Sequence, residues 1–296
     1  MILGQYIQAS IETTREISSL LEENLLAAGA VSITIQDGAD QPILEPGVGE
    51  MPLWDKCVIK ALFAANTDTN DITSIIDNFK FASEIHWELV EDKDWTQEWK
   101  KHFKPISCDT GKLWICPSWI KPPFANAINL HLDPGLAFGT GSHPTTMLCL
   151  NWLEKQSLSG KVVIDYGCGS GILGIAALLL GASKVVAIDN DPQALRSSRD
   201  NAERNGIKED KLTLLLPEQI PDIIQADIVV ANILANPLIE LADRINALIL
   251  PAGQLCLSGV LSHQASLVAT AYSSYVNFEP HIIEEGWVRL SGSKVR

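Results

Sequence analysis

Basic residues are scarce in this sequence, which has 22 Lys and Arg against 36 Asp and Glu and a formal net charge of −14 at pH 7. Binding through phosphate groups depends on Lys and Arg, so this balance argues against nucleic acid as a direct partner and suits a basic partner better. Most of the excess lies in residues 1–120, which hold 9 Lys and Arg and 19 Asp and Glu, a net charge of −10. An acidic surface that serves only solubility is about as frequent.

Paired cysteines and long apolar runs are also missing. The six cysteines form no Cys-x-x-Cys pair and have no histidine at metal-ligand spacing, so we expect neither a metal site nor disulfides. The longest apolar run, Ile172 to Ala182, is too short to span a bilayer, and the first residues do not resemble a signal peptide. We therefore expect a reduced, soluble, cytoplasmic protein, monomeric and without a membrane partner.

The first 90 residues change periodicity several times. Apolar residues alternate as in strands, then recur at helical spacing, and the order strand, helix, strand occurs twice. The strands are expected over 5–9, 30–36, 57–64 and 84–90, and the helices over 11–28 and 71–79. This order predicts a split βαβ, ferredoxin-like α+β domain over residues 1–90, in which no catalytic constellation occurs.

A charged segment with regularly spaced aromatics follows. Within residues 91–104, Trp95, Trp99 and Phe103 are four residues apart and would form one stripe on a helix. The stripe either docks on a neighbouring domain, within an interdomain linker over residues 91–120, or faces an ordinary core. The acidic flanks argue against a platform that stacks nucleic-acid bases.

From residue 121 to residue 296, strand and helix patterns alternate as in a doubly wound α/β domain. Strands are expected over 161–166, 184–189, 211–216, 227–231 and 254–260, and helices near 144–155, 171–180, 192–205, 237–249 and 262–275. The last strand-like pieces, 277–283 and 287–291, are too close for a crossover helix, so one terminal strand must be antiparallel. A mostly parallel, seven-stranded Rossmann-like sheet with a terminal hairpin resembles the large class of S-adenosylmethionine-dependent methyltransferases.

A glycine-rich loop over residues 165–171, Asp-Tyr-Gly-Cys-Gly-Ser-Gly, follows the first strand of this domain. Because glycine has no Cβ, the backbone can turn sharply and a ligand can lie against it at a helix N-terminus. The spacing differs from the Gly-x-Gly-x-x-Gly that binds a pyrophosphate, which Asp165 would repel. Both features favour S-adenosylmethionine, with Asp165, Gly167 and Gly169 among its contacts. For this loop alone, a tight turn without a ligand is the alternative.

Asp189 ends the next strand, at the sheet edge where open α/β sheets bind ligands. Its carboxylate can accept hydrogen bonds from both hydroxyls of a ribose. Asp191 and Pro192 then provide an N-cap and a first-turn proline, so a helix follows directly. The resulting strand-loop-helix-strand-helix unit favours a nucleotide cofactor over a turn without a ligand.

Asn232 follows the strand over 227–231 and opens the stretch Asn-Ile-Leu-Ala-Asn-Pro-Leu. In methyltransferases that act on nitrogen, the asparagine of an Asn-Pro-Pro-Tyr motif holds the amine so that its lone pair faces the methyl group, and catalysis is mainly orientation. Here Leu234 replaces the aromatic of that motif, so an aliphatic amine is the more natural acceptor. A strand-end turn residue is the structural alternative for Asn232.

The stretch 132–146, Leu-Asp-Pro-Gly-Leu-Ala-Phe-Gly-Thr-Gly-Ser-His-Pro-Thr-Thr, precedes the first helix of the domain. Its glycines and hydroxyl residues suit a loop that closes over a ligand, and Thr145 and Thr146 are expected near the methionine end of the cofactor. His143 is a candidate general base, although a histidine beside a proline at a helix start more often caps the helix.

Residues 132–146, 165–177, 189–194 and 231–238 together resemble the bacterial ribosomal protein L11 methyltransferase family, and the likeness covers nearly the whole chain. It implies methyl transfer from S-adenosylmethionine to lysine ε-amines and the N-terminal α-amine of large-subunit ribosomal protein L11. It also implies that the N-terminal domain recognises that protein and that a linker lets the domains reorient.

By motif position, the resemblance assigns cofactor contacts to Thr146, Gly167, Asp189 and Asn232, with Asn232 also orienting the acceptor amine. Two alternatives stay open. A methyltransferase acting on a nucleic-acid base would need a basic groove and an aromatic after Asn232, and both are missing. A non-enzymatic adaptor with a vestigial cofactor fold is disfavoured because Asp165, Asp189 and Asn232 are intact.

Overall fold

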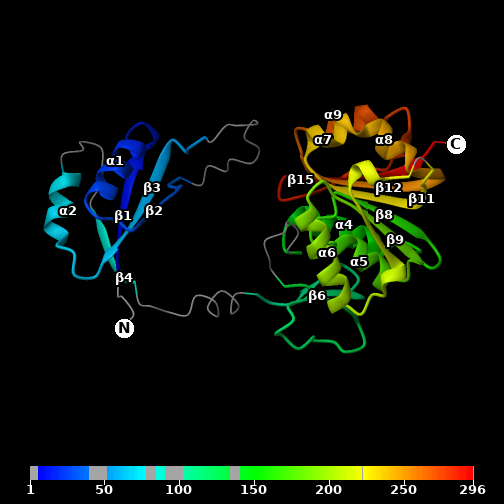
Figure 1. Ribbon diagram of the computed structural model, residues 1–296. Helices are drawn as coiled ribbons and strands as arrows, with labels where there is room; N and C mark the ends of the chain where they lie inside the picture. The colour runs from blue at the N-terminus through cyan, green and yellow to red at the C-terminus, as the bar shows by residue number, and fades with distance from the viewer. Residues whose placement is uncertain are drawn as a thin grey trace. The chain divides into compact units, whose positions relative to one another are not determined.

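The computed structural model describes residues 6–39, 52–77, 85–90, 103–133, 141–221 and 223–295. The chain divides into two compact units, Met1–Lys100 and Lys101–Arg296 (Figure 1). The predicted aromatic stripe at Trp95 and Trp99 and the glycine-rich residues 134–140 lie outside the described residues.

The N-terminal unit is an antiparallel sheet with two helices. Its elements are β1 (Tyr6–Thr14), α1 (Arg15–Ala27), β2 (Ser32–Asp37), β3 (Lys56–Ala64), α2 (Thr69–Ile76) and β4 (His86–Val90). The sheet order is β2-β3-β1-β4, and each pair of neighbours is antiparallel. Alternate residues of β1 and β3, such as Ile11 and Phe63, share one core with Leu21 of α1 and Ile72 of α2. The two helices therefore cover the same face of the sheet.

The first helix begins later than its apolar spacing predicts. Residues 11–14 extend β1, with Ile11 paired to Ile59 and Thr13 paired to Cys57, and Ile11 is fully buried. β-branched Ile11 and Thr13 alternate toward the covered face of the sheet, and pairing with β3 outweighs the local helical spacing. The expected helix over 11–28 is thus wrong over its first four residues.

The second unit is built on a mixed sheet. Its elements are α4 (Pro144–Glu154), β8 (Val162–Tyr166), α5 (Ile172–Leu179), β9 (Lys184–Ile188), α6 (Pro192–Arg204), β10 (Leu212–Leu215), β11 (Ala226–Asn232), α7 (Ala235–Glu240), α8 (Ala242–Ala247), β12 (Ile249–Leu261), α9 (Ala265–Tyr272), β13 (Val276–Phe278), β14 (Ile282–Glu284) and β15 (Trp287–Lys294). The order is β10-β9-β8-β11-β12-β15-β13, with β14 as an eighth strand beside β15.

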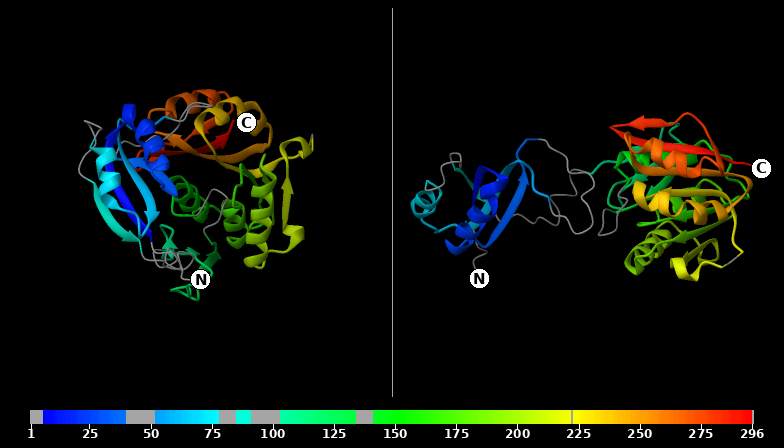
Figure 2. Two further views of the ribbon diagram at one scale, coloured as in Figure 1. Left: turned by 60° about the vertical axis from the view of Figure 1, so that its left-hand side comes forward. Right: turned by 90° about the horizontal axis from the view of Figure 1, so that it is seen from above.

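This sheet confirms the doubly wound fold with an antiparallel end. The five strands β10, β9, β8, β11 and β12 are parallel to one another, whereas β15 is antiparallel to β12, β13 and β14. Helices α4, α5 and α6 cover one face and α7, α8 and α9 cover the other (Figure 1, Figure 2). Each face has its own apolar core.

Two expected elements are divided by local backbone chemistry. The helix expected over 237–249 consists of α7 and α8, separated at Leu241, and α7 begins earlier because Pro237 fits in a first helical turn, where it removes no hydrogen bond. The strand-like piece 277–283 consists of β13 and β14, because Pro280 lies between them and has no N–H for the sheet.

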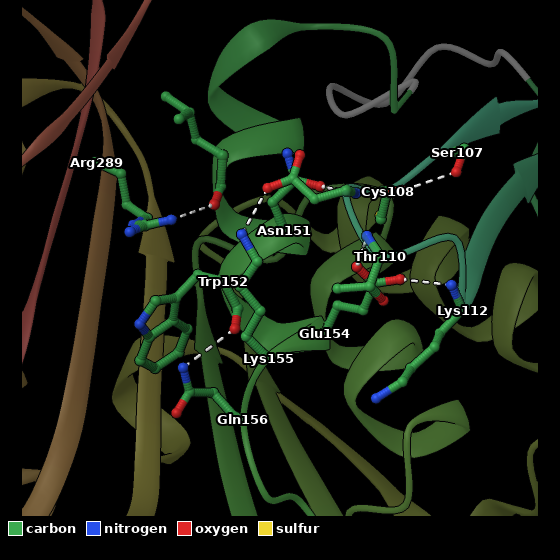
Figure 3. Close-up of polar contacts among 12 residues, drawn as sticks. Ser107, Cys108, Thr110, Lys112, Asn151, Trp152, Glu154, Lys155, Gln156 and Arg289 are labelled. Carbon is green, nitrogen blue, oxygen red and sulfur yellow. Dashed lines mark hydrogen bonds and ion pairs between the residues drawn. The ribbon is translucent and has the colours of Figure 1, made fainter.

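A small sheet of β5 (Ile106–Ser107), β6 (Leu113–Cys116) and β7 (Ile128–His131) precedes α4. The last turn of α4 holds the β5–β6 connection (Figure 3). The buried carboxylate of Glu154 accepts hydrogen bonds from the backbone N–H groups of Thr110, Lys112 and Leu113 at 2.8–2.9 Å. The small sheet therefore belongs to the second unit, and β5 and β6 lie within the stretch that the sequence assigns to a linker.

Candidate cofactor and acceptor site

The predicted site residues come from three neighbouring strands. β8 lies between β9 and β11, and all three are parallel. These strands lie side by side in Figure 1. The glycine loop, Asp189 and Asn232 follow or end them, so they meet at one edge of the sheet. The chain leaves β8 toward β9 and later returns to β11 on the other side. This reversal is the switch point at which doubly wound sheets bind ligands.

The glycine loop has a backbone that other residues adopt only at a cost. Gly167, Gly169 and Gly171 have φ angles of +75°, +54° and +79°, in the left-handed region that disfavours a side chain. The N–H groups of Gly167 and Cys168 donate to the carbonyl of Ile188 at 2.8 and 3.0 Å. The loop is thereby fixed to the end of β9.

Asp189 also holds this loop. One carboxylate oxygen accepts the N–H of Gly169 at 2.8 Å, and the other accepts the N–H of Asp191 at 3.0 Å. A carboxylate oxygen can accept more than one hydrogen bond, and Asp189 is half-buried, so it can still bind hydroxyl groups. The sequence predicts the ribose contact, whereas the bond to Gly169 depends on a loop shape that spacing alone does not reveal.

The space beside Gly167 is filled by the asparagine motif. A Cβ at Gly167 would lie 2.2 Å from Cγ2 of Ile233, and a Cβ at Gly259 would lie 2.3 Å from the carbonyl oxygen of Ile233. Ile233 is therefore packed between two glycines. This packing fixes the backbone next to Asn232, and the missing Cβ of Gly167 makes room for Ile233 where the sequence suggests room for a ligand.

Helix α6 supports the loop from the other side. Ser198 donates through its hydroxyl to the carbonyl of Gly169 at 2.9 Å, and Asn201 donates to the carbonyl of Ser170 at 2.9 Å. Both side chains are buried, and a Cβ at Gly171 would lie 2.7 Å from the Ser198 hydroxyl. Sequence reasoning missed this pair. Its signal is two polar residues three apart on the inner face of an amphipathic helix.

Asp165 is the most perturbed carboxyl of the site. It is fully buried, and one oxygen accepts the N–H of Gly174 at 2.9 Å. Burial, with a smaller contribution from the charge of Asp189, outweighs the lowering effect of the Gly174 hydrogen bond and raises the pKa of Asp165 to about 7. The second oxygen is buried and has no hydrogen-bond partner among the described residues.

Asn232 and Thr146 are brought together although 86 residues separate them. The amide nitrogen of Asn232 donates to the hydroxyl of Thr146 at 3.4 Å, and Thr146 is fully buried in the first turn of α4. The amide oxygen of Asn232 is buried and has no partner within the described part of the chain. A buried acceptor without a donor is uncommon, and it suits a site that receives an N–H from a bound molecule.

His143 caps α4, as the sequence favours. Its Nδ1 accepts the N–H of Thr145 at 3.3 Å. Burial lowers the pKa of His143, and the charge of Glu285 raises it by a smaller amount. The ring of Trp287 meets His143 edge to face, with 5.0 Å between the ring centroids. Trp287 was not predicted, because only the pairing of β15 brings it to this edge of the sheet.

Neither a metal-binding cluster nor a membrane-spanning helix occurs in the described ranges. No group of three or more His, Cys, Asp or Glu side chains there could hold a metal ion. Within the same ranges, no helix has the length and apolar character that a membrane span needs.

Comparisons with known proteins find similarity over nearly the whole chain. The family model described as Ribosomal protein L11 methyltransferase (PrmA) matches residues 5–295. Ribosomal protein L11 methyltransferase of Cellvibrio japonicus (strain Ueda107) is 50% identical, covering 98% of this chain and 99% of the relative, and that of Escherichia coli (strain SMS-3-5 / SECEC) is 51% identical with the same coverage. A crystal structure of ribosomal protein L11 methylase from Lactobacillus delbrueckii subsp. bulgaricus is 33% identical, with a TM-score of 0.57, and covers 62% of this chain and 96% of that one.

Proposed function

Because this chain belongs to the ribosomal protein L11 methyltransferase family, we propose that it transfers methyl groups from S-adenosylmethionine to amines of large-subunit ribosomal protein L11. The acceptors are lysine ε-amines and the N-terminal α-amine. The observation that carries this proposal is the amide of Asn232 at the switch point of the sheet. Its nitrogen is bonded to Thr146, and its buried oxygen has no hydrogen-bond partner among the residues that the structure describes.

The residues at this edge fit S-adenosylmethionine. Asp189 offers a half-buried carboxylate to the ribose hydroxyls. The glycine loop turns sharply at the end of β8, so a cofactor can lie close to its backbone. The buried oxygen of Asp165 that has no partner in the described ranges can accept hydrogen bonds and favours a positive charge nearby, such as the ammonium of the methionine end. We assign Thr146, Asp165, Gly167, Gly169, Asp189 and Asn232 to the cofactor site.

In the reaction, bound S-adenosylmethionine supplies a methyl group made electrophilic by the sulfonium. After the acceptor ammonium has lost a proton to solvent, Asn232 accepts an N–H of the neutral amine through its amide oxygen and so directs the nitrogen lone pair. The nitrogen would bond to the methyl carbon as the carbon–sulfur bond breaks. Thr146 fixes the orientation of that amide. Orientation of two reactants accounts for up to about 7–11 kcal/mol of a barrier in well-aligned systems, which makes it the main contribution that these two side chains offer.

The N-terminal unit is the proposed recognition module. Its sequence region carries most of the negative charge, and an acidic surface attracts a basic protein substrate and raises its concentration near the site. We propose a domain over residues 1–90 for this task, a linker over 91–120 and a methyltransferase domain over 121–296. The enzyme acts in the cytoplasm as a monomer, without direct nucleic-acid or membrane contact.

Incubation with labelled S-adenosylmethionine and separated ribosomal proteins, followed by mass spectrometry, tests the proposal. Label is expected on amines of L11. Asn232→Ala should lower turnover much more than cofactor affinity, because orientation acts mainly in the transition state. The exposed Asn236, four residues later, gives a matched control in Asn236→Ala, which should leave turnover unchanged.

The alternatives give different results in the same assay. Label on ribosomal RNA alone would indicate a nucleic-acid base methyltransferase. Absence of S-adenosylmethionine binding in calorimetry would indicate an adaptor. Equal losses of turnover and cofactor affinity in Asn232→Ala would reduce Asn232 to a cofactor contact.

A further inference from the structure

The tip of the β14–β15 hairpin lies at the catalytic edge of the sheet and has no role in the mechanism above. Trp287, the first residue of β15, pairs with Leu261 of β12. Asn232 pairs with Ser258 on the same strand, so Trp287 lies three residues beyond the level of Asn232. Both residues therefore face the edge where the cofactor loop lies.

A continuous series of contacts joins the two residues. Asn232 bonds to Thr146, and the N–H of Thr146 donates to the carbonyl of His143, one helical turn away, at 3.0 Å. The ring of His143 then packs edge to face against the indole of Trp287. The indole is half-buried, with part of its surface still accessible.

Two exposed glutamates, Glu284 and Glu285, lie in the hairpin that leads to Trp287. Glu284 pairs directly with Trp287 across the hairpin, and directly opposed residues place their side chains on the same face. Glu285 lies close enough for its charge to raise the pKa of His143, against the larger lowering by burial. Both glutamates are exposed.

The backbone at Glu285 is strained. Glu285 has a φ of +49° and is followed by Gly286 at +82°, as in the two-residue hairpin turns that prefer Asn-Gly. A glutamate there lowers stability relative to asparagine. Such outliers concentrate at functional positions, where the side chain is needed for another reason.

We propose that Trp287, Glu284 and Glu285 form the entrance that binds the cationic acceptor amine before methyl transfer. The carboxylates attract the lysine ammonium, and the indole face holds it by a cation–π interaction. Methylated ammonium groups keep their charge and become more apolar, so the same face continues to bind the amine between successive transfers. The inference rests on the proposed function, since it assumes an amine acceptor.

This placement also explains why Leu234 can replace the aromatic residue that follows the asparagine in the Asn-Pro-Pro-Tyr motif. The sequence has no aromatic after the asparagine motif, and Leu234 is 51% exposed. Trp287 supplies an aromatic face from a different strand. A lysine chain is long and narrow, so it needs a wall at the mouth of the site, whereas a planar base needs a stacking surface directly beside the asparagine.

Full-length variants test the proposal with purified L11 and with unmethylated and dimethylated lysine peptides. Trp287→Leu should raise the acceptor KM by about 2- to 30-fold, the range expected for a lost cation–π contact, and Trp287→Phe should raise it less. The dissociation constant for S-adenosylmethionine should not change. Glu285→Asn should raise the acceptor KM and weaken its salt dependence, while the more compatible turn residue keeps the thermal midpoint or raises it. Glu279→Gln removes an exposed acid outside the hairpin tip and serves as the control.

An unchanged acceptor KM in Trp287→Leu overturns the inference, as does an equal rise in the cofactor dissociation constant, which would indicate a general disturbance of the site. If Trp287→Leu does not fold, the acceptor KM of Trp287→Phe and of Glu285→Asn tests the entrance instead. Trp287→Phe keeps an aromatic ring, and Glu285 is exposed, so both variants are expected to fold. The proposed function is tested separately by the wild-type enzyme. Wild-type methylation of L11 with unaltered variants refutes only the entrance, whereas absence of wild-type methylation refutes the proposed function.

Discussion

Substitution of Gly167 by alanine tests how the cofactor loop is built. The new Cβ would lie 2.2 Å from Cγ2 of Ile233, which is far inside van der Waals contact. Ile233 cannot move away freely, because its carbonyl packs on Gly259. The variant must therefore displace the asparagine motif or the loop, and both changes reach Asn232.

The loss of folding stability in Gly167→Ala has two parts, backbone strain and overpacking. The left-handed φ of +75° at Gly167 costs about 1–2 kcal/mol for a residue with a Cβ, and overpacking costs about 1–3 kcal/mol more. We expect Gly167→Ala to lower the free energy of unfolding by about 2–5 kcal/mol. For a domain of this size, that corresponds to a fall of roughly 4–20 °C in the thermal midpoint.

Gly206→Ala separates the cost of backbone strain from the cost of overpacking. Gly206 has a similar φ of +67°, but nothing lies within 4 Å of its missing Cβ, so this variant reports backbone strain alone. Ile233→Ala in the Gly167→Ala background should remove the clash and so recover much of the stability that overpacking costs. The expected coupling energy in a double-mutant cycle is about 1–3 kcal/mol. Calorimetric unfolding measures the wild type, the three single variants and the double variant. Equal losses in Gly167→Ala and Gly206→Ala, or independent effects of Gly167 and Ile233, would refute the packing.

Three other outcomes are expected. Asp189→Ala should weaken S-adenosylmethionine binding by about 1–3 kcal/mol in titration calorimetry, with Asp189→Asn less affected; unchanged affinity would remove Asp189 from the site. Because the pKa of Asp165 is raised to about 7, its stabilisation is full below pH 4 and is lost as the pH rises through 7, by up to about 4 kcal/mol; denaturant titrations of Asp165→Asn should lack this slope, and a persisting slope would assign it to another group. Glu154→Ala leaves three backbone N–H groups without their acceptor and should cost about 3–5 kcal/mol, whereas Lys155→Ala, which breaks only a half-exposed ion pair with Asp109, should cost little; similar losses in chemical denaturation would contradict this difference.

The parts of the fold that the sequence predicts are those with local signals. The buried strand β8, the glycine loop and Asp189 lie within 28 residues, and apolar runs, glycines and a strand-end acid identify each of them without knowledge of the rest of the chain. The switch point follows, because parallel strands joined by helices place their C-terminal ends at one edge. The pairing of Asn232 with Thr146 is different in kind. The family resemblance assigns each residue to the cofactor site, but no spacing rule connects two residues so far apart, so the hydrogen bond between them is seen only in the structure.

The parts that the sequence does not predict depend on pairing between distant segments. At residues 11–14, helical spacing and strand alternation are both present, and only the register with β3 decides between them. Trp287 looks like an ordinary strand residue until β15 pairs with β12 and carries it to the catalytic edge. Ser198 can be assigned to an inner helix face from its spacing, but its partner, the carbonyl of Gly169, is set by the folded loop.

Helix α4 shows why these distant contacts matter for the chemistry. Its first turn carries His143 and Thr146, and its last turn holds the small sheet through Glu154 (Figure 3). Between them, the carbonyl of Leu148 accepts a hydrogen bond from Arg289 of β15 at 3.3 Å. An eleven-residue helix is about 16 Å long and nearly rigid. The contacts of Glu154, Leu148 and Thr146 therefore fix the position of the whole helix together. The amide of Asn232 bonds to Thr146, and His143 packs against Trp287, which the pairing of β15 with β12 brings to this edge. One helix therefore sets the distance between the group that orients the amine and the aromatic face that we propose receives it.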